Sequence, residues 1–271
     1  MRNPTPQRTS MSKYTTITTR RDGNVEYVTF CRPEVHNAFN SAMIFELISL
    51  FGKMRDDDQL RVVVLSGEGK SYCAGADLNW MREVKDFTYE QNLQESLALA
   101  EMLQAIYSFP KPTIGRINGA AIGGGTGLVA VTDIAIAAER AVFSFSEVKI
   151  GVVPACISPY VIKRVGEGKA RELFLSGERM TSARALATGL VNHVVPDDQL
   201  DNAVNKMTKQ LLSSGPVALG VCKELIQKVP GQTVEEYKKY TAEVIAKLRM
   251  SDEAQEGMDA FLNKRKPKWV E

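Results

Sequence analysis

The sequence predicts a mixed α/β fold followed by a helical C-terminal region. Short apolar runs alternate with amphipathic helical patterns from about residue 15 to residue 195, and beyond Pro196 the pattern is almost wholly helical. Alternation of strand, loop and helix is typical of parallel sheets covered by helices. With 271 residues, of which 44% are hydrophobic, the chain can bury the core of one large domain.

The first predicted elements are a hairpin and a helix. Two β-rich runs, 15–20 and 25–30, flank the turn 21–24, which predicts an antiparallel pair with no role in chemistry. Asn40 can cap the helix that follows, whose apolar residues recur at helical spacing and which ends before the acidic run 56–58.

A buried strand and a loop of small residues come next. The continuous apolar run 61–66 predicts a strand buried on both faces, and 67–75 predicts a loop. An amphipathic pattern then predicts a helix over 88–109, which Pro110 and Pro112 end.

The remaining elements continue the alternation and then become helical. Strands are expected at 113–117, 134–138 and near 142–145, with a helix at 125–131 between the first two. Ser158-Pro159 predicts a helix start, and Gly177 and Gly189 predict helix ends. The helices expected beyond Pro196 cover 198–213, 216–229, 233–250 and 251–265.

Charge and hydropathy exclude several classes of protein. The 34 basic and 32 acidic residues are mixed along the chain, so apart from the basic tail 264–268 nothing resembles a nucleic-acid-binding surface. No apolar run reaches the roughly 18 residues that span a bilayer, so we expect no membrane segment. The polar residues 1–10 lack the apolar segment of a secretory signal and predict a disordered leader, with Met11 as an alternative start.

Cysteine and histidine usage argues against a metal site. The four cysteines lie far apart without a CxxC pair, which disfavours zinc and thioredoxin-type sites, and the chain has only two histidines. We therefore expect no metal and a reducing, cytoplasmic location.

Two nucleotide-binding motifs fail on spacing. Gly69-Lys70-Ser71 follows a buried strand, but a phosphate loop needs glycine at position 64, where valine stands. The glycine cluster beginning at Gly123 lacks the last glycine of the dinucleotide fingerprint, because Leu128 occupies that position.

The glycine cluster 123–125 is the most informative feature of the chain. A strand that ends in glycines and opens into a helix exposes unpaired N–H groups, which can hold an oxyanion. Close packing of a strand–helix corner without a ligand explains the glycines equally well when they are considered alone. The small-residue loop 71–78 favours the first interpretation, because two such loops can present paired N–H donors to a carbonyl oxygen that becomes an enolate.

These segments together resemble the crotonase superfamily, the enoyl-CoA hydratase and isomerase family. The resemblance rests on SYCAGADL, NGAAIGGGTGL, SFSEVKIGVVP and SGERMTSARALATGLVNHVV and covers the chain from about Met11 to its end. It implies a spiral of ββα units at 11–200, a helical trimerisation region at 201–271 and assembly as a homotrimer or a dimer of trimers. It also implies an acyl-CoA thioester substrate, with coenzyme A as part of the substrate and no separate cofactor.

The resemblance assigns roles to particular residues. It implies that the backbone N–H groups of Ala74 and Gly124 hold the thioester oxygen, and that residues 74–77, namely Ala74, Gly75, Ala76 and Asp77, lie along the coenzyme A. Phe261 and Lys264 are the nearest matches to C-terminal residues that close the coenzyme A pocket of a neighbouring subunit.

The catalytic carboxylates of the family are only partly present. Hydratases of the family usually carry two glutamates; Gly127 stands at the first position, and Glu147 retains the second. Hydration needs a base for water and an acid for the α-carbon, and one carboxyl can do both in a syn addition. Isomerases of the family work with one glutamate, so a Δ3,Δ2-enoyl-CoA isomerase is an alternative, and a non-catalytic acyl-CoA-binding or RNA-binding member is a second.

A finer resemblance favours the hydratase. ADLNWM, GGGTGLVAVTD and SEVKIGVVPACISPYVI are similar to the bacterial methylglutaconyl-CoA hydratase branch of leucine degradation, which shares the glycine at position 127. This implies a branched or dicarboxylic acyl group. A second carboxylate would call for a cation, for which the candidates are Arg82, Lys85, Arg116 and Lys149.

Overall fold

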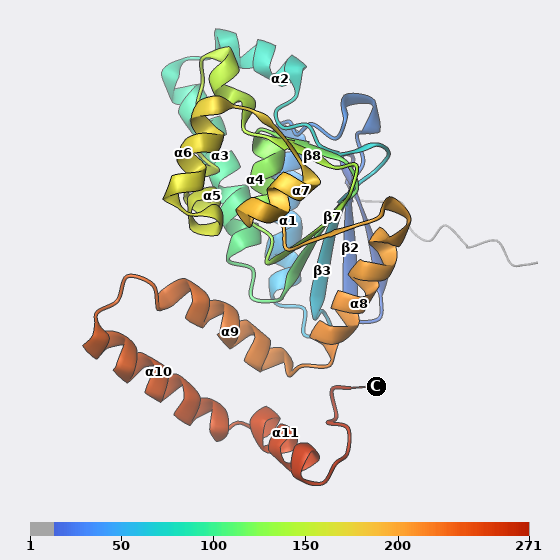
Figure 1. Cartoon of the computed structure of the whole chain (residues 1–271), viewed down its shortest axis with the longest axis vertical. Helices are drawn as coiled ribbons and strands as arrows, with labels where there is room; N and C mark the ends of the chain where they lie inside the picture. Colours follow the sequence, from blue (N-terminus) through green and yellow to red (C-terminus); the bar gives the residue numbers. More distant parts are fainter. Residues whose placement is uncertain (1–13, 271) are drawn as a thin grey trace, which may run out of the picture.

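Two sheets form the body of the molecule in the computed structural model, which describes residues 14–270 (Figure 1). The six-stranded sheet has the order β1 (Ile17–Asp22), β2 (Val25–Phe30), β3 (Val62–Gly67), β5 (Thr113–Ile117), β7 (Ile134–Ala138) and β10 (His193–Val195). The four-stranded sheet has the order β4 (Ser71–Cys73), β6 (Ala120–Ile122), β8 (Val142–Ser144) and β9 (Arg179–Thr181).

The chain winds through these sheets as a spiral. It passes from β3 to β4, from β5 to β6 and from β7 to β8, and a helical segment follows each pair. Strands β3, β5 and β7 are parallel neighbours in the first sheet, and β4, β6 and β8 are parallel neighbours in the second. The predicted α/β fold of ββα units is therefore confirmed.

Helices cover the sheets and then continue beyond them. Those of the body are α1 (Ser41–Arg55), α2 (Leu78–Glu83), α3 (Tyr89–Tyr107), α4 (Gly124–Ala130), α5 (Ser158–Val165), α6 (Glu167–Ser176), α7 (Ser182–Thr188) and α8 (Leu200–Leu212). The last three are α9 (Pro216–Lys228), α10 (Val234–Arg249) and α11 (Asp252–Leu262). Short 3-10 turns are η1 (Pro33–Val35), η2 (Val84–Asp86), η3 (Ser146–Ile150) and η4 (Asp197–Gln199).

Most predicted elements are confirmed, and the differences have local causes. Asn40 caps α1 by accepting from the Met43 N–H, and all six residues of β3 are buried. The hairpin turn is shorter than predicted because β1 continues to Asp22, which leaves only Gly23 and Asn24 between the strands. The predicted loop 67–75 contains β4, a three-residue strand too short to show a pattern in the sequence.

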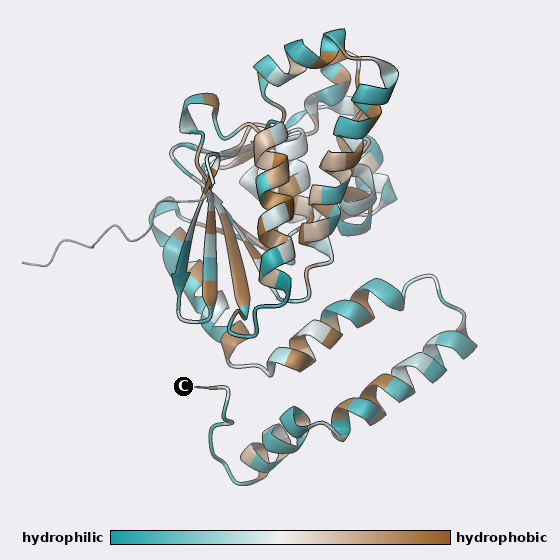
Figure 2. Cartoon of the chain, turned by 180° about the vertical axis from the view of Figure 1, so that it is seen from behind, coloured by the Kyte–Doolittle hydropathy of each residue, from teal (hydrophilic) through white to brown (hydrophobic). Residues whose placement is uncertain are grey.

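Helices α9–α11 extend from the body as an arm (Figure 1). No residue of α9 or α10 is buried, and Ala260 is the only buried residue of α11. Figure 2 shows apolar residues along these helices nevertheless. The division at residue 200 into a catalytic core and a trimerisation region stays a prediction, and the predicted leader 1–10 lies outside the described residues.

Several polar contacts attach the arm to the body, among them a hydrogen bond from the Gln227 amide of α9 to the Tyr107 carbonyl at 3.0 Å. The Lys223 ammonium group, from α9, lies 2.7 Å from an Asp133 carboxylate oxygen, and burial lowers the pKa of this lysine. The Arg61 guanidinium donates to the backbone carbonyls of Ser214 and Trp269. In residues 14–270 no helix is both long and apolar enough to cross a bilayer.

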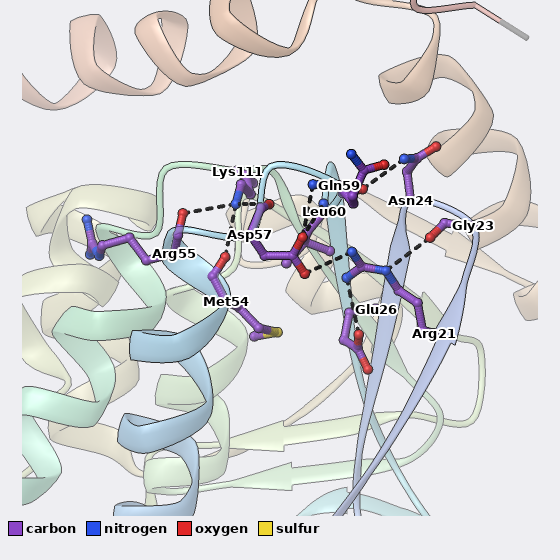
Figure 3. A network of polar contacts seen from close by, with 10 residues as sticks. All are labelled: Arg21, Gly23, Asn24, Glu26, Met54, Arg55, Asp57, Gln59, Leu60 and Lys111. Carbon is purple, nitrogen blue, oxygen red and sulfur yellow. Dashed lines mark hydrogen bonds and ion pairs between the residues drawn. The ribbon is translucent and has the colours of Figure 1, made fainter. Parts of the chain in front are cut away.

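The C-terminal end of α1 is held by Lys111, a half-buried lysine from the segment before β5 (Figure 3). The Lys111 ammonium donates to the carbonyls of Met54, Arg55 and Asp57 at 2.9, 2.9 and 2.7 Å. The Asp57 carboxylate in turn accepts from Arg21 of the hairpin at 2.9 Å. One cation therefore satisfies three carbonyls at a helix end, where unpaired carbonyls and the helix dipole favour positive charge.

Replacing Lys111 with methionine is expected to lower the free energy of unfolding by about 1–3 kcal/mol, because partly buried carbonyls lose a charged donor. Urea unfolding measures this change, with Lys238→Met on exposed α10 as the matched control, for which we expect a change within about 0.5 kcal/mol. Equal effects of the two substitutions would contradict the role of Lys111.

Candidate functional site

A cavity of about 380 Å³ lies where the loop after β4 meets the start of α4. Its walls come from residues 74–76, the turn 122–124, the segment 146–157 and the facing sides of α2 and α3. These segments are distant in sequence and gather in the body, away from the arm (Figure 1). The cavity thus unites the two glycine-containing loops that the sequence singled out.

The loop 74–77 is held against the segment after β2 by three backbone hydrogen bonds. The Ala74 N–H donates to the His36 carbonyl at 3.0 Å, the Phe39 N–H to the Gly75 carbonyl at 2.8 Å, and the Asp77 N–H to the Phe39 carbonyl at 2.9 Å. The N–H of Ala74 is therefore already engaged. This corrects the expectation that Ala74 supplies a free N–H donor to the thioester oxygen.

Two other N–H groups at the cavity remain available. Within residues 14–270, neither the Ala76 nor the Gly124 N–H donates to a protein acceptor. Both residues line the cavity, and a β-carbon added to Gly75 would lie 3.4 Å from the Gly124 nitrogen, so the two loops meet closely there. Each of the two loops therefore offers one available N–H group to the cavity, that of Ala76 rather than Ala74 and that of Gly124.

A salt bridge between Arg32 and Asp77 also anchors the loop 74–77. An Asp77 carboxylate oxygen lies 2.6 Å from the Arg32 guanidinium, which also donates to the Ala38 carbonyl. The other Asp77 oxygen accepts from the Asn79 N–H and so caps α2. Burial opposes ionisation of Asp77, but the Asn79 N–H and the Arg32 charge hold its pKa below the usual range. Asp77 is thus an anchor of the loop rather than a group exposed to a ligand.

Glycine is required at the turn into α4. Gly123 has φ +52°, and a β-carbon there would lie 3.1 Å from a Glu147 carboxylate oxygen. A β-carbon on Gly124 would lie 2.5 Å from the Phe39 ring, closer than real contacts allow. Side chains here would push the Gly124 N–H, Phe39 and Glu147 apart, so the glycine cluster is what lets them share one cavity.

Glu147 contributes a carboxyl group to the cavity wall. It lies in η3 at the cavity wall, and its Oε2 atom is buried without a hydrogen-bond partner among the described residues. Burial raises the pKa of Glu147 above that of an exposed glutamate. A carboxyl of raised pKa whose Oε2 atom lacks a fixed partner is suited to take and return a proton.

The rest of the described lining is mostly apolar and carries no cation, and its other polar side chains are those of Ser96, Ser146 and Trp80. Glu147 and the Cys156 thiol are the titratable groups that the described part of the chain places in the wall. Gly127 lies within α4 and is buried, outside the lining. The candidate cations are elsewhere: Arg116 pairs with Asp201 and Arg82 bonds Asn79, and neither these two nor Lys85 and Lys149 line the cavity.

Phe261 and Lys264 are not brought to the cavity of their own chain. Phe261 is 82% exposed near the end of α11, and Lys264 is exposed just beyond it. Figure 1 shows α11 at the opposite end of the molecule from α2. Their predicted contact with a neighbouring subunit stays a prediction.

A family model, "Enoyl-CoA hydratase/isomerase", matches residues 20–271 of this chain. The chain belongs to this family. It is also 32% identical over 266 residues to a protein of Dictyostelium discoideum named as a probable mitochondrial enoyl-CoA hydratase, covering 97% of this chain and 94% of that protein.

Solved structures of the family superpose closely on this fold. An enoyl-CoA hydratase from Shewanella pealeana is 38% identical with a TM-score of 0.91, covering 95% of this chain and 97% of that one. An enoyl-CoA hydratase/isomerase from Marinobacter aquaeolei is 32% identical with a TM-score of 0.91, covering 94% and 99%. The chain is therefore an enzyme of this family, and membership implies an acyl-CoA substrate.

The anchor of the loop gives a prediction about stability. Arg32→Met is expected to lower the free energy of unfolding by about 3–5 kcal/mol, because it leaves the buried Asp77 carboxylate unpaired. The double variant Arg32→Met/Asp77→Asn should lose less than the single variant. Urea unfolding measures both variants. The matched control is Arg171→Met, which breaks the exposed Arg171–Glu167 pair and should lower the free energy of unfolding by about 0–1 kcal/mol.

The pH dependence has a defined sign. Because the pKa of Asp77 is lowered in the folded state, its stabilisation is present above the unfolded pKa and is lost as pH falls. The cost of Arg32→Met should therefore shrink under acid conditions. A cost that does not change with pH would contradict this role for the pair.

Proposed function

We propose that the protein adds water to a 2-enoyl-CoA thioester, with Glu147 as the only carboxyl that acts as acid and base. The observation that carries the proposal is that one mostly apolar cavity contains the buried Glu147 Oε2 atom and two backbone N–H groups, none of which has a partner among the described residues. Donors fixed by the fold stabilise the charge of an enolate at little cost in reorganisation.

The proposed reaction has two proton transfers by one group. The Ala76 and Gly124 N–H groups hold the thioester oxygen, which polarises the double bond. The Glu147 carboxylate takes a proton from water as the water oxygen bonds to the β-carbon, and the electron pair of the double bond moves to the enolate. Protonated Glu147 then returns the proton to the α-carbon, which restores the thioester and gives a 3-hydroxyacyl-CoA by syn addition.

A Δ3,Δ2-enoyl-CoA isomerase remains the second candidate, because it uses the same groups. Glu147 would remove a proton from the α-carbon of a 3-enoyl-CoA and return it to the γ-carbon, without water. The absence of a side chain at Gly127 is the specific observation that favours it.

The acyl group is expected to be branched or dicarboxylic, as in 3-methylglutaconyl-CoA. The lining argues against the second of these properties. A second carboxylate in the cavity would find no cation in the described wall and would share the space with the Glu147 carboxyl. Burying a charge without a partner costs free energy.

We also propose that the arm completes the site between subunits of a trimer or a dimer of trimers. Large apolar side chains stay exposed on all three helices of the arm in a single chain, among them Ile226, Ile245 and Met258. Exposed apolar surface of this extent supports burial against another copy. Phe261 and Lys264 of that copy would then close the coenzyme A pocket.

The Glu147→Gln variant tests the proposed reaction. Hydration of crotonyl-CoA, followed by loss of the enoyl absorbance, should fall by at least about 100-fold because the amide can neither take nor give the proton. Turnover of a 3-enoyl-CoA without hydration would establish the isomerase instead. Neither reaction in the unmodified protein would leave a non-catalytic acyl-CoA-binding or RNA-binding member, and RNA binding would weaken steeply with salt.

The Tm of the Glu147→Gln variant, measured against pH, gives a second test that does not depend on activity. Burial raises the pKa of Glu147 in the folded state, so its contribution to stability is present below the unfolded pKa and is lost as pH rises through the folded pKa. Glu147→Gln should therefore raise Tm at neutral pH and lose this advantage in acid. A lower Tm at neutral pH would contradict the burial of an ionised carboxylate.

A matched pair of substrates tests the acyl preference. 3-Methylcrotonyl-CoA and 3-methylglutaconyl-CoA differ by one carboxylate on the acyl group. We expect kcat/KM to be at least about tenfold higher for the uncharged member, because the cavity offers the second carboxylate no partner. A higher kcat/KM for 3-methylglutaconyl-CoA would show that a cation reaches the acyl group, contrary to this view of the cavity.

A further inference from the structure

The space beside Gly127 is filled by a single side chain. A β-carbon added to Gly127 would lie 2.1 Å from Cγ2 and 2.8 Å from Cβ of Ile157. Both distances are far below van der Waals contact, and the atoms belong to the branch point of Ile157 rather than to a flexible end. Even alanine at position 127 therefore requires a shift of Ile157 or of the backbone.

Ile157 has little freedom to move aside. It stands immediately before α5, and its carbonyl accepts from the Tyr160 and Val161 N–H groups at 3.2 and 3.1 Å. The residue is 2% exposed, and β-branching leaves its χ1 angle few alternatives. The contact between Gly127 and Ile157 is thus fixed by the packing of α4 against α5.

Ile157 also forms part of the cavity wall that contains Glu147. Gly127 itself is not part of the wall. A side chain at this position would point toward Ile157. Ile157 therefore lies between position 127 and the cavity. In the described wall the other titratable group is the Cys156 thiol, so Glu147 is the one carboxyl there.

We propose that Ile157 determines the one-carboxyl character of this site, because it occupies the space through which a side chain at position 127 would reach the cavity. A second acid or base group can then act from position 127 only when Ile157 is shortened. This inference rests on the proposed function, in which Glu147 is the acid and base group.

The catalytic test introduces a second carboxyl with and without the space for it. The variants are Gly127→Glu/Ile157→Ala, its matched control Gly127→Gln/Ile157→Ala, and Ile157→Ala alone, each compared with the unmodified protein. The readout is the pH dependence of kcat/KM for hydration of crotonyl-CoA.

We expect the unmodified protein, Ile157→Ala and the glutamine control to show one ionisation on the acid side, that of Glu147. The double variant with glutamate should show a bell-shaped profile, because one carboxyl must be ionised and the other protonated. A folded glutamate variant whose profile matches that of the glutamine control would overturn the proposal.

A packing test decides the same point without activity. Gly127→Ala should lower Tm, and Ile157→Ala in the same chain should recover part of that loss, although Ile157→Ala alone also lowers Tm by leaving a cavity. Strictly additive changes would overturn the proposed contact. If the unmodified protein hydrates no enoyl-CoA, the proposed function fails while this thermal cycle still gives its own result for Ile157.

Discussion

The site depends on the backbone contact between residues 36–39 and residues 74–77. Three hydrogen bonds hold one segment against the other, and the Ala76 N–H has no acceptor among residues 14–270. The first segment is itself fixed by Asn37, which is fully buried, has a positive φ of 56° and donates to the carbonyls of Glu68 and Ser71. The direction of one N–H group is therefore set by the packing of the β2–α1 connection against the end of β4.

The same close approach sets the electrostatics of the cavity. Glycines at 123 and 124 allow Glu147 and the Phe39 ring to come within contact of the backbone, which removes water from the carboxyl. Desolvation by burial then raises the pKa of Glu147. The desolvated carboxyl and the two unpaired N–H groups are thus consequences of how tightly the loops pack.

Sequence patterns predicted the fold, the glycine turn and Glu147 because these depend on local features: apolar periodicity, a strand running into glycines, and motifs of fixed spacing. They could not predict which N–H of the loop is free, because the Ala74 N–H is engaged by His36, a residue before α1. They missed β4 because three residues carry no periodicity. Arg116 was a candidate cation for the cavity, but it pairs with Asp201 of α8 instead. The charge of a residue in the sequence does not reveal which partner it meets in the fold.

The most direct test of the central claim is a crystal structure with a bound acyl-CoA thioester. We expect the thioester oxygen to lie about 3 Å from the backbone nitrogens of both Ala76 and Gly124, with the acyl carbons facing the Glu147 carboxyl. The Ala74 N–H should keep its bond to the His36 carbonyl. A thioester oxygen bound to the Ala74 N–H, or one outside this cavity, would contradict the account.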